Sequence, residues 1–121
     1  MSIPKLDFPP FHLPAEAEAL RGEVRAFLKE TLPKIQSEDR FASWNTPSPE
    51  FSRALGAKGW LGITWPKQYG GAERTFLDRL VVTEELLGNS APAGSHWVAD
   101  RQSGPLLLKF GTEQQRQAIL P

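Results

Sequence analysis

The side chains best suited to chemistry gather in the last third of the chain, at His96, Trp97, Asp100, Arg101 and Gln102. His96 and Asp100 are four residues apart, so on a helix they share a face. Trp97 and Arg101 have the same spacing and share the neighbouring face. A Gly104-Pro105 pair follows and predicts a kink or a new helical segment. Residues placed before such a kink can line a pocket, and a structural hydrogen-bond network or plain surface fits the same pattern.

Other kinds of site leave no pattern in the sequence. There is no cysteine, which excludes disulfides, thiolate chemistry and cysteine-based metal sites. The two histidines, His12 and His96, lie far apart and outside any metal-ligand spacing. Gly70-Gly71 is not followed by the Lys-Ser/Thr of a nucleotide-binding loop, and no serine stands in a nucleophile elbow. We therefore predict no catalytic, cofactor-binding or metal-binding residue in this chain.

Two adjacent acids, Glu84 and Glu85, fall inside a predicted helix. On a helix they point about 100° apart, so they are not expected to act as one carboxylate pair. We expect one to be buried or capping and the other exposed. The predicted apolar stripe includes Glu84 together with Leu77, Leu80, Val81 and Leu87, which predicts that Glu84 is the partly buried acid.

Composition and charge exclude several classes of function. The 121 residues carry 14 basic and 14 acidic side chains, so the formal net charge is zero and there is no electrostatic footprint for nucleic acid. No apolar run is long enough to predict a membrane span. The N-terminus lacks the basic start and apolar stretch of a secretory signal. These features predict a cytoplasmic protein.

Helical spacing and end signals predict an all-α chain. We expect an extended arm at residues 1–13 and helices over 14–32, 48–58, 75–88, 95–110 and 112–120. A loop at residues 34–47 should be pinned to the body by Phe41 and Trp44. The apolar run from Leu106 to Phe110 is dense enough to be buried nearly all round. The predicted fold is a small up-and-down bundle of about four to six helices.

A connector at residues 59–71 separates two of these helices. It contains four glycines, one proline and three large aromatic residues. Glycine permits backbone conformations that other residues resist, and aromatic side chains bury large apolar areas. The composition predicts a tightly folded segment docked on the core, with residues 61–65 as the one candidate for a short extended piece.

Several of these motifs, in this order, resemble the acyl-CoA dehydrogenase family. Residues 59–71 are similar to the segment that follows the family's second helix. Residues 107–121 resemble its hydrophobic helix, Gly-Thr-Glu cap, Gln-Arg helix and closing Leu-Pro. Residues 20–32 and 75–87 resemble its first and third helices, and residues 95–106 are similar to one bacterial branch. The resemblance covers residues 14–121 and implies the family's N-terminal helical domain.

The resemblance implies an enzyme of fatty acid metabolism built from three domains. In that family FAD lies between a middle β-domain and a C-terminal bundle, which also carries the catalytic glutamate. This sequence ends at Pro121, where the β-domain is expected to begin. FAD is therefore expected in a full-length enzyme, with no activity in the isolated chain. The implied partners are an acyl-CoA substrate, the missing domains and further copies in a homo-oligomer.

The resemblance also implies a substrate-binding role for His96, Trp97, Arg101 and Gln102 as part of the wall of an acyl pocket. An arginine in such a pocket is costly if it is unpaired. We expect Arg101 to pair with Asp100 or to meet a polar substrate group, such as a carboxylate at the far end of the acyl chain.

Two alternatives stay open at this stage. Relatives of the family use the same helical domain in acyl-CoA oxidases, flavin monooxygenases and nitroalkane oxidases, and the discriminating residues lie beyond this sequence. A free-standing, non-catalytic helical interaction module would instead have a closed surface. The dehydrogenase domain predicts an exposed apolar patch where the missing domains dock.

Overall fold

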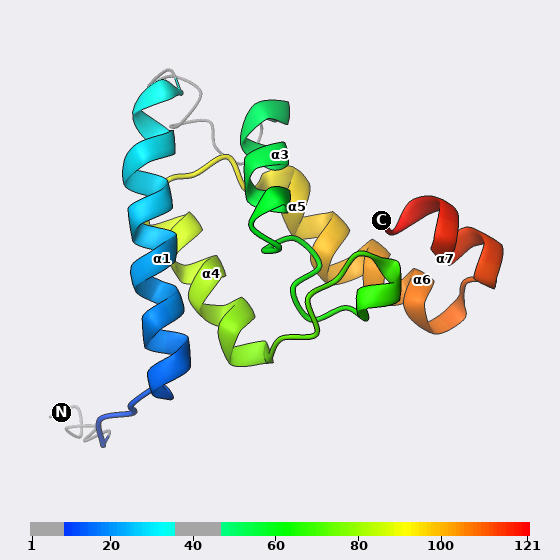
Figure 1. The fold of residues 1–121 in the computed structure, drawn as a ribbon, viewed down its shortest axis with the longest axis horizontal. Helices are drawn as coiled ribbons and strands as arrows, with labels where there is room; N and C mark the ends of the chain where they lie inside the picture. The colour runs from blue at the N-terminus through cyan, green and yellow to red at the C-terminus, as the bar shows by residue number, and fades with distance from the viewer. Residues whose placement is uncertain (1–8, 36–46) are drawn as a thin grey trace, which may run out of the picture.

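The computed structural model describes residues 9–35 and 47–121, and within these ranges every regular element is helical (Figure 1). The α-helices are α1 (Ala15–Thr31), α3 (Pro49–Ala57), α4 (Phe76–Gly88), α5 (Gly94–Val98), α6 (Gly104–Phe110) and α7 (Glu113–Ile119). Two 3₁₀ turns, η1 (Leu32–Lys34) and η2 (Lys67–Tyr69), and one π-helical turn, η3 (Ala99–Ser103), complete the described elements. The prediction of an all-α chain is confirmed.

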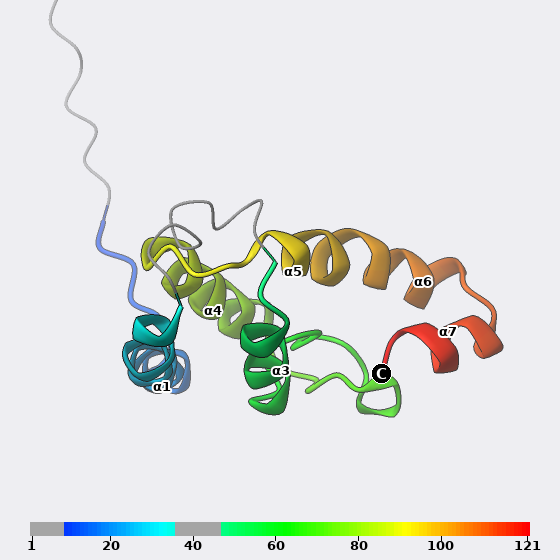
Figure 2. The same cartoon turned by 90° about the horizontal axis from the view of Figure 1, so that it is seen from above.

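Three elements, α5, η3 and α6, follow each other without a break and form one long rod (Figure 2). The described part therefore has five helical rods, within the predicted number. The candidate extended piece at residues 61–65 is wrong, because these residues form bends and turns. Phe41, Trp44 and residues 1–8 of the expected arm lie outside the described residues.

The predicted end signals lie where the helices begin. The Ser48 hydroxyl accepts a hydrogen bond from the Phe51 amide at 3.3 Å and caps α3. Thr75 forms a reciprocal capping box with Asp78 at the start of α4, and Thr112 forms one with Gln115 at the start of α7. Each cap satisfies amides that a helix start leaves without an intrahelical partner.

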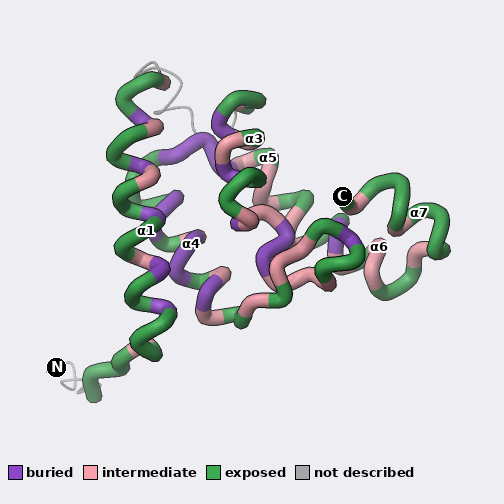
Figure 3. Tube along the Cα trace, viewed as in Figure 1, coloured by how far each residue is buried: buried purple, intermediate pink, exposed green. Residues whose placement is uncertain are grey.

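The core lies between α1 and α4 and continues under α3 and the connector (Figure 3). Helix α1 contributes one buried stripe, Ala17, Leu20, Val24 and Leu28. The connector adds Trp60 and Ile63, which confirms that it is docked on the core. The Trp60 ring meets the Phe27 ring edge-on with a centroid distance of 5.3 Å, a geometry that aromatic pairs favour.

A second aromatic residue of the connector, Trp65, explains the glycines around it. A Cβ atom on Gly62 would lie 2.5 Å from the Trp65 ring, and one on Gly104 would lie 2.0 Å from it. A Cβ on Gly71 would lie 2.1 Å from the Trp65 carbonyl oxygen. The indole therefore packs directly against backbone, and it joins the connector to the start of α6.

The structure corrects two predictions about burial. Of the two adjacent acids, Glu85 is the buried one and Glu84 is half exposed. The buried stripe of α4 contains Asp78, Val81, Val82, Glu85 and Leu86. This stripe includes two acids. The prediction from sequence spacing therefore chose the neighbouring stripe, which is more apolar. The run from Leu106 to Phe110 is not buried all round, because no described element covers its outer face.

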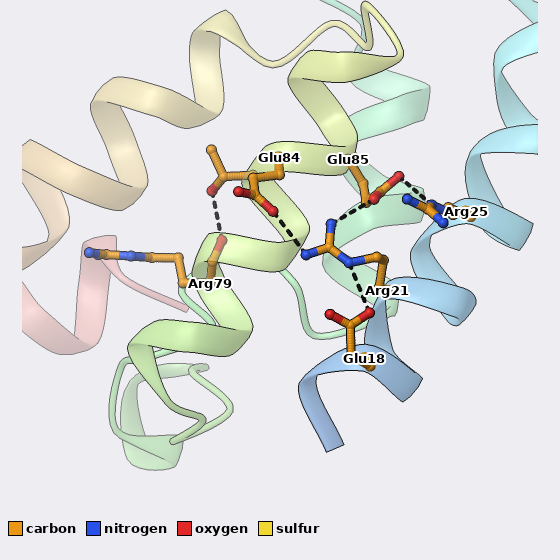
Figure 4. A network of polar contacts seen from close by, with 7 residues as sticks. Glu18, Arg21, Arg25, Arg79, Glu84 and Glu85 are labelled. Carbon is orange, nitrogen blue, oxygen red and sulfur yellow. Dashed lines mark hydrogen bonds and ion pairs between the residues drawn. The ribbon is translucent and has the colours of Figure 1, made fainter. Parts of the chain in front are cut away.

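Arginines of α1 explain how Glu85 can face inward (Figure 4). Arg21 donates to Glu85 at 2.8 Å, to Glu84 at 2.9 Å and to Glu18 at 3.2 Å, and Arg25 donates to Glu85 at 2.9 Å. The hydrogen bond from Arg25, followed by that from Arg21, holds the pKa of Glu85 below its ordinary value. The side chains of Glu84 and Glu85 leave the helix in different directions, and both still bind the guanidinium of Arg21.

Candidate functional site

A small cavity of about 30 Å³ lies where α3, the connector, α4 and the α5–η3 rod meet. Most of its wall is apolar, formed by residues such as Leu55, Trp60, Leu61, Val82 and Leu86. Its polar wall consists of Arg79 and Thr83 from α4 and of His96, Asp100 and Arg101 from the rod. The cavity therefore brings together most of the residues that the sequence singled out.

His96 is anchored by one of its two ring nitrogens. Its Nε2 atom lies 2.7 Å from the Ser52 hydroxyl oxygen on α3, and its buried Nδ1 atom has no hydrogen-bond partner among the described residues. Burial lowers the pKa of His96 from its ordinary 6.5, and the nearby Asp100 carboxylate opposes that shift. The imidazole is thus held neutral near physiological pH.

Asp100 ties the rod to the connector. Its Oδ1 atom accepts a hydrogen bond of 2.8 Å from the Gly62 amide. This contact places Asp100 on the connector and leaves no ion pair between Asp100 and Arg101 among the described residues. The structure therefore does not show the ion pair between Arg101 and Asp100, which was one of the two roles expected for Arg101.

Arg101 is held by a hydroxyl and an aromatic ring. It donates a hydrogen bond to the Thr83 hydroxyl, and its guanidinium carbon lies 4.1 Å from the centroid of the Trp97 ring. The predicted shared face of Trp97 and Arg101 is thereby confirmed. Burial, followed by repulsion from Arg79, lowers the pKa of Arg101. Within the described ranges, no carboxylate lies within ion-pair distance of its guanidinium.

Gln102 lies apart from these residues. It is exposed on the π turn and does not border the cavity. The sequence predicted an interruption at Gly104-Pro105, and the structure has a π turn over the five residues directly before that point. Single π turns inside helices are frequent at functional sites. This one carries Asp100 to the connector and Arg101 to α4.

Sequence reasoning missed two residues of the cavity wall, Arg79 and Thr83. They are four residues apart on α4, which places them on one face, and this spacing was the available signal. Their proximity to Arg101 depends on how α4 packs against the rod, which no local pattern encodes.

A larger hollow of about 530 Å³, here called the cationic groove, opens beside the cavity. It is lined by Thr64, Trp65, Phe76, Arg79, Arg101, Pro105, Leu108 and Lys109. Arg79 and Arg101 border both the cavity and the groove. The groove thus combines three cationic side chains with aromatic and aliphatic walls.

Residues 9–35 and 47–121 contain neither a cluster of metal ligands nor a membrane-spanning helix. No three histidine or acidic side chains in these ranges gather as metal ligands. None of the helices seen there has the length and apolar character needed to cross a bilayer.

The buried state of His96 predicts a pH-dependent stability. Because its pKa is lower in the folded chain, the unfolded chain binds the proton more readily, and stability falls as the pH drops below about 6.5. A His96→Gln variant should lose less stability than the wild type between about pH 7 and about pH 5. Urea unfolding at several pH values measures this difference. Parallel pH curves for the two proteins would contradict it.

The family model and similar curated proteins point to the same family. Residues 14–121 match the family described as acyl-CoA dehydrogenase, N-terminal domain. The chain is 29% identical over 114 residues to acyl-CoA dehydrogenase FadE26 of Mycobacterium tuberculosis, covering 88% of this chain and 27% of that protein. It is 37% identical over 111 residues to mitochondrial isovaleryl-CoA dehydrogenase of Pongo abelii, covering 90% of this chain and 26% of that protein.

Solved structures agree in fold as well as in sequence. The ChsE4-ChsE5 complex from Mycobacterium tuberculosis superposes with a TM-score of 0.70 at 28% identity, covering 93% of this chain and 28% of that one. A variant of the Tcur3481-Tcur3483 steroid ACAD superposes with a TM-score of 0.72 at 31% identity, covering 90% and 29%. The chain thus spans less than a third of each relative. It belongs to the acyl-CoA dehydrogenase N-terminal domain family.

Proposed function

We propose that residues 14–121 form the N-terminal helical domain of an FAD-dependent acyl-CoA dehydrogenase, an oxidoreductase that removes hydrogen from the α and β carbons of an acyl-CoA thioester. The observation that carries this proposal is the apolar surface at the far end of the molecule. Leu106 is 59% exposed, Phe110 71% and Ile119 60%. Exposed large apolar side chains on two consecutive helices are the kind of surface on which a further domain can dock. The following domains of the full-length enzyme are the proposed partners there.

This exposed surface also favours a domain of a larger protein over a free-standing interaction module. A self-sufficient module of this size would bury Leu106 and Phe110 rather than leave them in water, since each buried side chain of this kind contributes about 1.5–3 kcal/mol. The expectation of an exposed apolar patch, made for a domain with missing neighbours, matches the surface of α6 and α7.

FAD does not fit the described residues of this chain. The one glycine pair that precedes a long helix, Gly70-Gly71, leads to α4, and its first turn is already capped. The Asp78 carboxylate accepts a hydrogen bond from the Thr75 amide at 3.0 Å and would repel a phosphate at that helix end. We therefore assign FAD to the other domains of the full-length enzyme and assign no chemical step to this chain.

The role we propose for this chain is to shape the substrate site. The cavity wall, with His96, Trp97 and Arg101, supports a contribution to the acyl pocket. Ser52 holds His96 on α5, and Gly62 and Thr83 hold Asp100 and Arg101 on the π turn. Gln102 stays a substrate-binding prediction, and its exposed position allows contact only with a group that comes from outside the described chain. The complete enzyme is proposed to be an oligomer.

The experiment is to isolate the full-length protein that carries this chain and to add acyl-CoA without oxygen. We expect a bound flavin whose visible absorbance bleaches as the acyl chain gains a double bond. Reoxidation by an electron-transfer dye, with little hydrogen peroxide formed in air, distinguishes a dehydrogenase from an oxidase. A protein without flavin, or a flavin that acyl-CoA does not reduce, would refute the proposed activity.

A further inference from the structure

The cationic groove holds three positive side chains and no acid. Arg79, Arg101 and Lys109 line it, and none of them has a carboxylate within ion-pair distance over residues 9–35 and 47–121. Their contacts are with a hydroxyl or with aromatic rings: Arg101 contacts Thr83 and Trp97, Arg79 contacts Phe76, and Lys109 contacts Phe110. The groove therefore carries three positive charges and no direct ion pair, although the Asp100 carboxylate is near enough to favour the charged form of Arg101.

This lack of an ion pair distinguishes the two groove arginines from most of the other described arginines. Arg21, Arg25, Arg74 and Arg116 each lie within ion-pair distance of a glutamate or aspartate. The remaining described arginine, Arg53, is fully in the exposed class, where water solvates its charge. Arg79 and Arg101 are instead only partly exposed. An anion that enters the groove would supply the missing charge.

The three cations also face a common space. In Figure 4 the Arg79 side chain extends away from Glu84 and Glu85, on the side opposite the α1 arginines. Arg79 and Arg101 line the same two hollows, and the positive charge of Arg79 disfavours the charged form of Arg101. Like charges held together while partly desolvated are unfavourable, and a bound anion relieves both costs.

The walls indicate what kind of anion fits. Trp65, Phe76, Pro105 and Leu108 present apolar surface that suits a hydrocarbon chain better than a hydrated pyrophosphate. A volume of about 530 Å³ lies within the usual size of a small-molecule site. A guanidinium offers two parallel N–H donors that match the two oxygens of a carboxylate.

We infer that the cationic groove binds a carboxylate at the far end of an acyl chain, so that the enzyme acts on acyl-CoA thioesters whose acyl group ends in a carboxylate. Arg101 is the primary contact and Arg79 the supporting one. This inference rests on the proposed function, because it assumes that the groove opens toward the acyl pocket of the full-length enzyme.

The test measures binding, so that it does not depend on turnover. Two S-alkyl-CoA thioethers of equal length, one ending in a methyl group and one in a carboxylate, are titrated into the full-length protein by calorimetry. Thioethers lack the acidifying carbonyl and are not dehydrogenated. We expect Arg101→Gln to weaken binding of the carboxylate-ended analogue about tenfold or more, and to change binding of the methyl-ended analogue less than about twofold. Arg79→Gln should have the same selectivity with a smaller effect.

The matched control is Arg53→Gln, which removes an exposed arginine of α3 outside the groove. It should change neither dissociation constant. Equal weakening of both analogues by Arg101→Gln, together with weaker binding of free CoA, would place the CoA phosphates in the groove and overturn the inference. No effect on either analogue would mean that an acid from another part of the full-length protein occupies it, which overturns it as well. If neither analogue binds the wild type, the proposed function fails and not only this inference.

Discussion

Replacing Gly104 by alanine is expected to destabilise the chain by about 3 kcal/mol, at the upper end of the usual cost of overpacking. The new methyl group would lie 2.0 Å from one carbon of the Trp65 ring and 2.5 Å from the next. On another side the ring lies close to Gly62, where a Cβ atom would be 2.5 Å from it, which limits how it can shift. Alanine must therefore separate α6 from the connector or expel the indole. Urea unfolding of the wild-type and variant chains measures the loss.

Gly22→Ala is the matched control for this prediction. Gly22 lies within α1, is exposed, and a Cβ atom there would meet nothing within 4 Å. Alanine is the better helix former, so this variant should be more stable than the wild type by about 0.5–1 kcal/mol. If Gly104→Ala behaves like Gly22→Ala, the packing of Trp65 against the start of α6 is not as described.

Replacing Glu85 by alanine is expected to cost about 2–3 kcal/mol of stability, because it removes a buried carboxylate that accepts hydrogen bonds from two arginines. Only 8% of its side chain is exposed. Arg21, which is largely buried, would keep its contacts with Glu18 and Glu84 but lose its bond to the inward-facing acid. The substitution would therefore weaken the packing of α1 against α4, which forms the centre of the core.

Glu84→Ala is the matched control, since Glu84 is the neighbouring acid and is 50% exposed with a single bond to Arg21. It should cost less than about 1 kcal/mol. The pH dependence gives a second readout. The pKa of Glu85 is lowered in the folded chain, so its contribution is present at neutral pH and is lost as the pH falls below 4.5. Glu85→Ala should lose less stability on acidification than the wild type. Equal costs for the two variants would contradict the assignment of Glu85 as the buried acid.

The elements of the fold were predictable because their signals are local. The caps at Ser48, Thr75 and Thr112 act within three residues of the chain, and the structure shows each of them at the start of a helix. The helical spacing of Leu20, Val24 and Leu28 needed no knowledge of what covers them. An all-α chain follows from such signals alone.

The inward face of α4 was not predictable in this way. A stripe with two acids is less apolar than its neighbour. Its acids are buried because Arg21 and Arg25 of α1 bind Glu85, and because Arg74 and Thr75 bind Asp78. The exposure of Leu106 and Phe110 was missed for a related reason. Sequence records that a side chain is apolar but not whether the described chain contains anything to cover it.

The candidate site was predictable only in part. The spacing that places Trp97 beside Arg101 is local, and the contact is present. The partners of the site come from three other elements: Ser52, Gly62 and Thr83. These contacts depend on packing, as does the meeting of Arg79 with Arg101, so no reading of the motif alone would have found the cationic groove.

The central claim is that this chain is one domain of a larger flavoenzyme. The most direct test is the intact mass of the native protein from its source cells, measured together with its flavin content. The proposal predicts a mass several-fold above the 13.5 kDa of this chain, with bound flavin. A native protein near 13.5 kDa without flavin would contradict it and would favour a free-standing helical module.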